Sequence, residues 1–533
     1  MACLPPDILI EVFHLIPHPE IYWHRYGLLD VAAVNKAWRT AALESSSLWS
    51  CIRTETRRDL FLLPLLLERS RTSPLDVRLN YFCDEYGNPS EDTTPSKRAE
   101  VVQALLPHVR RIQKLCIRHQ MLEPDSEDMG TISRLVDAGL EFTILTEYKH
   151  ESLEGDDNSE EYATLNFTAP SLLKASLDGV CPREWSKFLA PTLVDLHITS
   201  IDLDTLGTIF QQCQSVTSLK LHNGFEEEDT PGPLSHPGPL TPPPSIRTLD
   251  LQMSMPELVA VLNLFSTSPI LHSLTICDDQ GLTAHQLKRK QPHPILTHML
   301  RGLGPLTAFE VYGDQDVVLR DATGRTRRFH VAAEDDPCYD TGALWAFLVA
   351  RHDAHHTVRT ILGTTAAWRS LASALKRRQP EPPADSGSGV ELQIILDHYA
   401  VIPTDDDNPI PPIHLAALSK LTLQPPGGVR IARCNVAVVL QSVSMVRSER
   451  RGVVVCLGGL MLEGVAPRGY VAEHQKFVDG LKGVGPEGMW LPCAHCVARA
   501  EEIQDRGRWC VHCRMGDEAM KERCDNNWHR GWP

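Results

Sequence analysis

The feature that most constrains the fold of this sequence is a short apolar pattern, L-x-x-L-x-L, that recurs along the middle of the chain. Each copy ends in two apolar residues separated by one other residue, which is the spacing of a β-strand with one buried face. The copies stand at residues 112–117, 172–177, 193–198, 216–221, 246–251 and 271–276. From residue 193 onward the pattern returns after about 23, 30 and 25 residues. This regularity predicts a series of similar units, each contributing one strand.

Units of this length and pattern are typical of leucine-rich repeats. One unit cannot bury its leucines alone, but stacked units share a continuous core. Weaker copies follow at residues 306–311, 358–362, 392–396, 418–423 and 453–457. We therefore predict an α/β fold in which residues 99–470 form an irregular leucine-rich-repeat solenoid, irregular because the usual asparagine ladder is missing. The alternative is an ordinary α/β domain whose strands happen to begin with leucine.

The length and net charge of the chain exclude some classes of protein. A chain of 533 residues is too long for one compact core and fits several domains or one extended array. A net charge of −16 argues against a nucleic-acid-binding surface over the whole chain. The sequence has neither a signal-peptide pattern nor an apolar run near the roughly 20 residues that span a bilayer. We expect a cytoplasmic or nuclear protein that contacts neither nucleic acid nor membrane.

The first fifty residues carry a second pattern. Pro5 and Pro6 suit the first turn of a helix, where backbone N–H groups have no partner within the helix. An apolar stripe at helical spacing follows, formed by Ile8, Leu9, Val12, Phe13 and Ile16. So short a unit cannot bury this surface alone, so either the rest of the chain or a partner must cover it.

These residues resemble an F-box of the type found in mushroom-forming fungi. The resemblance lies in Leu-Pro-Pro-Asp-Ile-Leu at 4–9, Val-x-Lys-x-Trp-Arg at 34–39 and Leu-Trp at 48–49, and it continues through the leucine-rich segment 60–70 and through residues 73–79. It implies a three-helix unit at residues 1–52 that docks onto a Skp-family adaptor of a cullin–RING ubiquitin ligase. The positions that match the adaptor-facing motif are Leu4, Pro5, Ile8, Leu9, Val12, Phe13, Leu28, Val34 and Trp38. Asn35 stands where the family usually has cysteine.

The leading interpretation is a substrate-recognition subunit of an SCF-type ubiquitin ligase, with the repeats binding a target protein. Residues 53–98 would connect the two parts through a helix, a first strand and an acidic loop. The competing interpretation is a leucine-rich-repeat scaffold for protein interactions without a link to ubiquitination. We find no arrangement of residues typical of catalysis, and we expect a protein that is not an enzyme.

The last segment, residues 471–533, is rich in cysteine. Cys493 and Cys496 form one C-x2-C pair, and Cys510 and Cys513 form another after thirteen residues. Two such pairs supply the four thiolates of a tetrahedral Zn²⁺ site. We predict a structural zinc knuckle, and no other cofactor; the alternative is a poorly ordered tail. Further candidate ligands are His495, His512, Cys524 and His529.

Overall fold

The structure is a computed structural model of the 533-residue chain, and it forms two compact units, residues 1–269 and 270–533. The residues that it describes are 5–15, 32–54, 57–81, 95–120, 134–153, 163–199, 201, 203–222, 241–265, 271–278, 298, 300–312, 316–331, 357–364, 368, 371–372, 375, 389–396, 412–415, 418–424, 432–434, 436–448, 451–457, 460–462, 467–484, 489–494, 496–498 and 500. Within these residues, no helix combines the length and the apolar character needed to cross a membrane.

The chain begins with short helices. Helix α1 spans Pro6–Leu15, α3 spans Lys36–Glu44, and a 3₁₀ turn, η1, spans Ser46–Trp49. Asn35 precedes α3 in an extended conformation, and its side-chain oxygen accepts a hydrogen bond from the Trp38 N–H at 2.9 Å. Asn35 is therefore an N-cap, a position that asparagine fills well. The cap accounts for an asparagine at this position.

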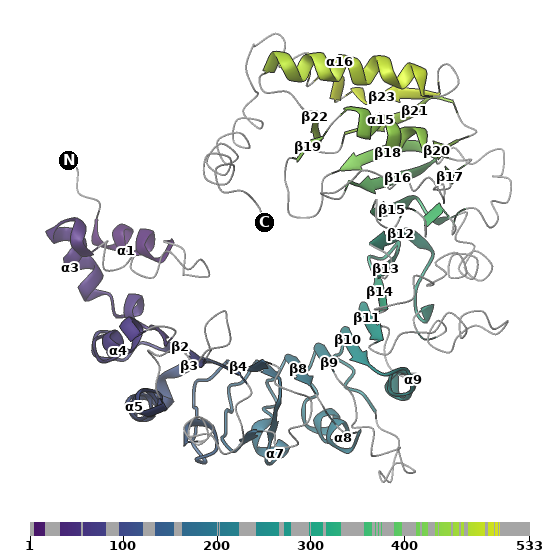
Figure 1. Cartoon of the computed structure of the whole chain (residues 1–533). Helices are drawn as coiled ribbons and strands as arrows, with labels where there is room; N and C mark the ends of the chain where they lie inside the picture. Colours follow the sequence, from purple (N-terminus) through teal and green to yellow (C-terminus); the bar gives the residue numbers. More distant parts are fainter. Residues whose placement is uncertain are drawn as a thin grey trace. The chain divides into compact units, whose positions relative to one another are not determined.

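The first unit contains a parallel sheet whose strands pair in chain order, β1-β2-β3-β4-β6-β8-β9-β10. Its strands are β1 Cys51–Arg53, β2 Leu75–Tyr81, β3 Ile112–Gln120, β4 Glu147–Leu153, β6 Lys174–Leu177, β8 Asp195–Thr199, β9 Ser218–His222 and β10 Thr248–Met253. The connections include α4 Arg57–Arg69, α5 Pro95–Leu105, η2 Leu106–Arg111, α7 Trp185–Phe188 and α8 Leu203–Gln212, and α9 Met255–Leu264 follows β10. Two further short strands, β5 Ala163–Leu165 and β7 Val180–Pro182, pair with each other. Helices α5, α7 and α8 lie on one side of the sheet (Figure 1).

The core of this unit lies between the sheet and these helices. Along each strand, apolar side chains alternate with polar ones, so that Leu196 and Ile198 of β8 are buried while Asp195, His197 and Thr199 are half-buried on the opposite face. Neighbouring strands repeat this alternation in register, because β8 pairs with β9 from Asp195 opposite Ser218 onward. The leucines of the recurring sequence pattern therefore form one continuous apolar layer.

The second unit contains a mixed sheet with the pairing order β11-β14-β13-β12-β15-β16-β18-β21-β23. Its strands are β11 Ser273–Asp278, β12 Leu306–Tyr312, β13 Asp316–Asp321, β14 Thr326–Val331, β15 Thr360–Thr364, β16 Val390–Ile395, β18 Leu418–Gln424, β21 Val453–Cys456 and β23 Trp490–Pro492. Smaller pairs join β17 Ile413–His414 to β20 Val446–Arg447, and β19 Ala432–Cys434 to β22 Leu460–Leu462. Helices α15 Val436–Ser444 and α16 Pro467–Gly483 belong to the same unit.

The structure thus establishes a mixed α/β architecture with large sheets after the helical N-terminal segment. A strand overlaps every one of the segments that the recurring pattern predicts, from β3 to β21. The leucine-rich-repeat solenoid itself is not confirmed. In the second unit the rule of one strand per repeat fails, because β13 runs antiparallel to both β12 and β14, and β14 and β13 together separate β11 from β12.

Candidate functional site

The inward face of α1 forms a small core. Leu9 is 1% exposed and Phe13 is 4% exposed, and both pack with Ala41 and Ala42 of α3. The rings of Phe13 and Trp38 lie 5.4 Å apart and are tilted against each other. Leu9 and Phe13 therefore hold α1 against α3 and do not face solvent. A partner could contact them only if this core opened.

The outward face of the same segment keeps apolar side chains in solvent. Ile8 is 45% exposed, Val12 is 38% exposed and Val34 is 58% exposed, and Pro5 is exposed as well. Ile8 and Val12 are four residues apart on α1, so they lie on the same side of the helix. Leu4 and Leu28, the other two positions of the expected docking motif, lie outside the described residues. The motif is thus divided between an interior half and a solvent-exposed half.

The face of the first sheet opposite its buried leucines carries polar side chains in rows. One row follows the pairing register across seven strands through Arg78, Cys116, Lys149, Ser176, His197, Lys220 and Asp250. Positively and negatively charged side chains form ion pairs on this face, including Lys114 with Glu147 at 3.1 Å and Arg118 with Glu151. We call this surface the strand face.

A histidine pair lies within the strand face. The Ser176 hydroxyl and His197 Nδ1 are 3.0 Å apart, and His197 Nε2 lies 3.3 Å from His222 Nδ1. Burial, together with the neighbouring His222 and Lys220, lowers the pKa of His197 to about 4. His197 is therefore neutral near pH 7, and the charges of the strand face come from its lysines, arginines and carboxylates.

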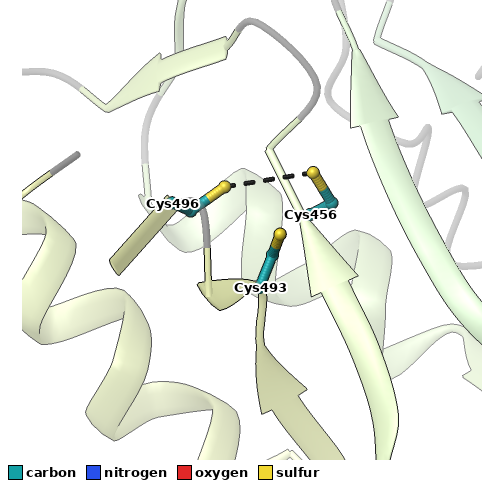
Figure 2. A group of neighbouring side chains, drawn as sticks. All are labelled: Cys456, Cys493 and Cys496. Carbon is teal, nitrogen blue, oxygen red and sulfur yellow. Dashed lines mark hydrogen bonds between the residues drawn. The ribbon is translucent and has the colours of Figure 1, made fainter. Parts of the chain in front are cut away.

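A cluster of three cysteines lies in the second unit (Figure 2). The Sγ atoms of Cys456, Cys493 and Cys496 all lie within 4.8 Å of one another, and those of Cys456 and Cys496 are 3.9 Å apart. Cys456 is the last residue of β21, and Cys493 directly follows β23. Because β21 and β23 are parallel neighbours, with Val455 opposite Pro492, these two cysteines meet at the same sheet edge.

Cys496 joins the cluster from a turn that begins at Cys493. The Val497 N–H donates to the Cys493 carbonyl at 3.1 Å, and the Leu457 N–H donates to Cys496 Sγ at 3.4 Å. The contact with Cys456 and burial raise the pKa of the Cys496 thiol above its ordinary value, so the metal-free thiol is neutral at pH 7. The structure thus brings together two of the four cysteines predicted from the sequence.

The other predicted ligands, Cys510 and Cys513, lie outside the described residues, as do His495, His512, Cys524 and His529. Cys456 is the cysteine that the spacing argument missed, since it lies 37 residues before Cys493 in the chain. A signal for it existed in the sequence. Cys456 closes the Val-Val-Val-Cys strand at 453–456, which the apolar pattern already predicted.

Comparison with known proteins identifies only the beginning of the chain. A family profile described as F-box-like matches residues 1–55. A search of curated proteins finds no match to this sequence. The matched residues include α1, α3, η1 and β1, so the comparison supports the family resemblance for the helical segment.

Proposed function

We propose that the chain is a substrate-recognition subunit of an SCF-type ubiquitin ligase. The observation that carries this proposal is the F-box-like segment at residues 1–55, which keeps Ile8, Val12 and Val34 exposed although it has a core of its own. F-box segments of this kind dock onto Skp-family adaptors. The fungal type of F-box, suggested by the sequence resemblance, is part of this proposal.

The adaptor would cover the exposed apolar side chains. An apolar side chain that remains in water gains free energy when a partner buries it, by about 25 cal/mol per Å². Scattered apolar residues are normal on protein surfaces. Here they coincide with positions of the docking motif, and Leu9 and Phe13 hold the helix that carries two of them. In this proposal the buried residues Leu9 and Phe13 fix the orientation of α1, and the exposed residues Ile8 and Val12 contact the adaptor.

The target protein would bind the repeat region, which we propose to be a degenerate leucine-rich-repeat array. The strand face supports this assignment, because its charged side chains, such as Lys149 and Lys220, project from a rigid parallel sheet. Surface charges of both signs favour partner selectivity and orientation over affinity alone. The chain would supply no catalytic group, and ubiquitin transfer would belong to the partner enzymes.

The experiment is a binding titration of the full chain with a purified Skp-family adaptor. We expect Ile8→Asp and Val34→Asp each to weaken binding at least tenfold, because a carboxylate buried without a partner in an apolar interface is costly and tenfold corresponds to about 1.4 kcal/mol. Phe61→Asp is the matched control. Phe61 is an apolar side chain that is 83% exposed and lies beyond the F-box-like segment, so its variant should bind as the unmodified chain does.

Hydrogen exchange of peptides from α1 and α3 would verify that each variant keeps the small core. Unchanged affinity in both folded variants would contradict the docking surface. No measurable binding of the unmodified chain to any adaptor of its source organism would instead favour the interaction scaffold without a ligase.

A further inference from the structure

We propose that Cys456, Cys493 and Cys496 bind one Zn²⁺ ion that fastens the end of β23 to β21 in the second unit. This inference is independent of the proposed ligase function. It differs from the site predicted by sequence spacing, because it makes Cys456 a ligand. The ligand set therefore joins two chain segments that lie 37 residues apart.

The distances fit one small metal ion. In a tetrahedral Zn²⁺ site with Zn–S bonds of about 2.3 Å, two sulfur atoms are separated by roughly 3.8 Å. The Cys456 and Cys496 sulfurs are 3.9 Å apart, and Cys493 Sγ completes a group whose members all lie within 4.8 Å. Only small side-chain rotations would bring all three sulfurs to bonding distance of one ion.

The kind of ligand selects the kind of metal. Thiolates are soft ligands, and the structural zinc sites of proteins are built from cysteine thiolates, either alone or together with histidine. Magnesium and calcium prefer oxygen ligands, so they are poor candidates for this site. An iron–sulfur cluster distributes its cysteine ligands over two or more irons, so three cysteines of one cluster would not all lie as close together as ligands of a single ion.

The backbone holds the ligands in place without the ion. The Cys493 N–H donates to the Val455 carbonyl at 2.8 Å, which continues the ladder between β21 and β23 and fixes Cys493 beside Cys456. The turn from Cys493 to Val497 then places Cys496 on the same side. The Leu457 N–H already points to Cys496 Sγ, and such N–H groups stabilise the charge of a metal-bound thiolate.

Among the described residues, the Lys420 side chain brings a positive charge near the cluster. The Lys420 ammonium is within electrostatic range of Cys456 and Cys493, and it also forms an ion pair with Glu391 at 2.8 Å. Three thiolates and one Zn²⁺ carry a net charge of −1, and this cation, already paired with Glu391, would offset only a small part of that charge. Burial of Cys496, which is 7% exposed, would protect the metal–sulfur bonds from water.

The site would have a structural role. Strand β23 has only three residues, so few ladder hydrogen bonds hold it to β21. An ion shared by Cys456 of β21 and by Cys493 and Cys496 after β23 would add a cross-link at that edge. Structural zinc contributes to folding free energy directly, because the unfolded chain has no preformed site.

The test begins with the zinc content of the purified full chain, for which we expect about one equivalent under reducing conditions. Cys456→Ser should lower the zinc content at least tenfold. Cys116→Ser is the matched control, since Cys116 is also a half-buried strand cysteine but lies in the other unit, and this variant should keep its zinc.

A second measurement needs no variant and covers the case in which Cys456→Ser fails to fold. In the unmodified chain, a chelator should increase alkylation of Cys456, Cys493 and Cys496 together, while alkylation of Cys116 stays constant. Three results would overturn the proposal. They are zinc near zero in the unmodified chain, full zinc content in folded Cys456→Ser, and a Cys456 alkylation rate that does not respond to the chelator. If folded Cys456→Ser keeps its full zinc content and Cys510→Ser loses its zinc, the ligands are those predicted from sequence spacing.

Discussion

Replacement of Asp321 by asparagine should destabilise the β13–β14 hairpin strongly, although the two side chains have almost the same shape. Asp321 is 3% exposed. Its Oδ1 accepts hydrogen bonds from the Thr323 N–H at 2.8 Å, the Thr323 hydroxyl at 2.7 Å and the Arg325 N–H at 3.0 Å. Its Oδ2 accepts from the Gly304 N–H at 2.8 Å. The carboxylate thus ties the turn to the loop that precedes β12.

The cost follows from these contacts. If the amide oxygen of asparagine keeps the three bonds of Oδ1, its NH₂ group faces the Gly304 N–H. Two donors then oppose each other, and a buried donor without a partner costs about 1–3 kcal/mol. The remaining bonds also lose the strength that an ionised acceptor gives them. We expect a total loss of about 3 kcal/mol at pH 7.

The pH dependence gives an independent measure. Burial raises the pKa of Asp321, but the hydrogen bonds from Gly304, Thr323 and Arg325 outweigh it and lower the pKa to about 2. The charged form therefore stabilises the fold by about 2 kcal/mol. This contribution is complete above about pH 4 and is lost as the pH falls through about 2. Between pH 7 and pH 3 the difference between the unmodified chain and the Asp321→Asn variant should shrink by about 1 kcal/mol.

Hydrogen exchange of peptides from residues 316–331 is the appropriate assay, because it reports local opening in a chain with two compact units. A loss of 3 kcal/mol should speed exchange on the order of 100-fold. Asp250→Asn is the control, because the ion pair of Asp250 with Lys220 is long, at 3.9 Å, and should contribute little to stability. Equal exchange in the Asp321→Asn variant and the unmodified chain would refute the hydrogen-bond argument.

Two further predictions concern packing. Gly480→Ala should destabilise α16 by about 1 kcal/mol despite the better helix propensity of alanine, because the added Cβ would overlap Leu440 Cδ1. Gly483→Ala, where nothing lies within 4 Å of the added Cβ, should be neutral, and thermal unfolding of both variants tests the contrast. Trp49→Phe should lower the stability of the α3 segment by about 2 kcal/mol, because Trp49 is buried and its Nε1–H donates to the Ala42 carbonyl at 2.7 Å. Faster hydrogen exchange of α3 amides would confirm this prediction, and protection equal to that of the unmodified chain would contradict it.

The sequence predicted where most strands lie because their signal is local. An alternating L-x-x-L-x-L segment has one apolar face whatever the rest of the chain does, and the strands at β3, β8 and β18 follow this pattern. Strand β4 was missed because its inward residues include Tyr148 and His150 rather than leucines. The Tyr148 hydroxyl bonds to His150 Nδ1 at 2.8 Å, so a polar pair fills the core there.

The β13–β14 hairpin was missed for a different reason. Asp316–Asp321 and Thr326–Val331 each alternate only in part, and Arg327 points inward as a buried cation. Its guanidinium donates to the carbonyls of Leu271 and Arg301, at 3.1 and 3.3 Å. The pattern of apolar and polar residues would predict that an arginine at this position is exposed to solvent. The Gly324 turn, with φ of +81°, was the signal available for a hairpin.

The docking motif shows that an apolar stripe on a helix does not determine which of its residues are buried and which are exposed. Ile8 and Leu9 are neighbours with similar side chains, yet Ile8 is 45% exposed and Leu9 is 1% exposed. The stripe is wider than the contact with α3, so a part of it must remain outside the core. Sequence spacing identified Leu9 and Phe13 but omitted Ile10, which also packs against the small core, and only the packing partner determines which members stay exposed. Surface variants for binding and core variants for stability can therefore be chosen only from the structure.

The cysteine cluster extends this reasoning to residues that are distant in the chain. Ligand spacing within one turn, as between Cys493 and Cys496, is local and can be predicted. The pairing of β21 with β23 is not local, because about 33 residues that include β22 and α16 separate the two strands. In a parallel sheet the last residues of paired strands meet at one edge. A cysteine at the end of one strand therefore lies next to the residues that directly follow the paired strand. Any search for metal sites in such a chain should therefore compare the residues at the carboxyl ends of predicted strands, in addition to those at short spacing.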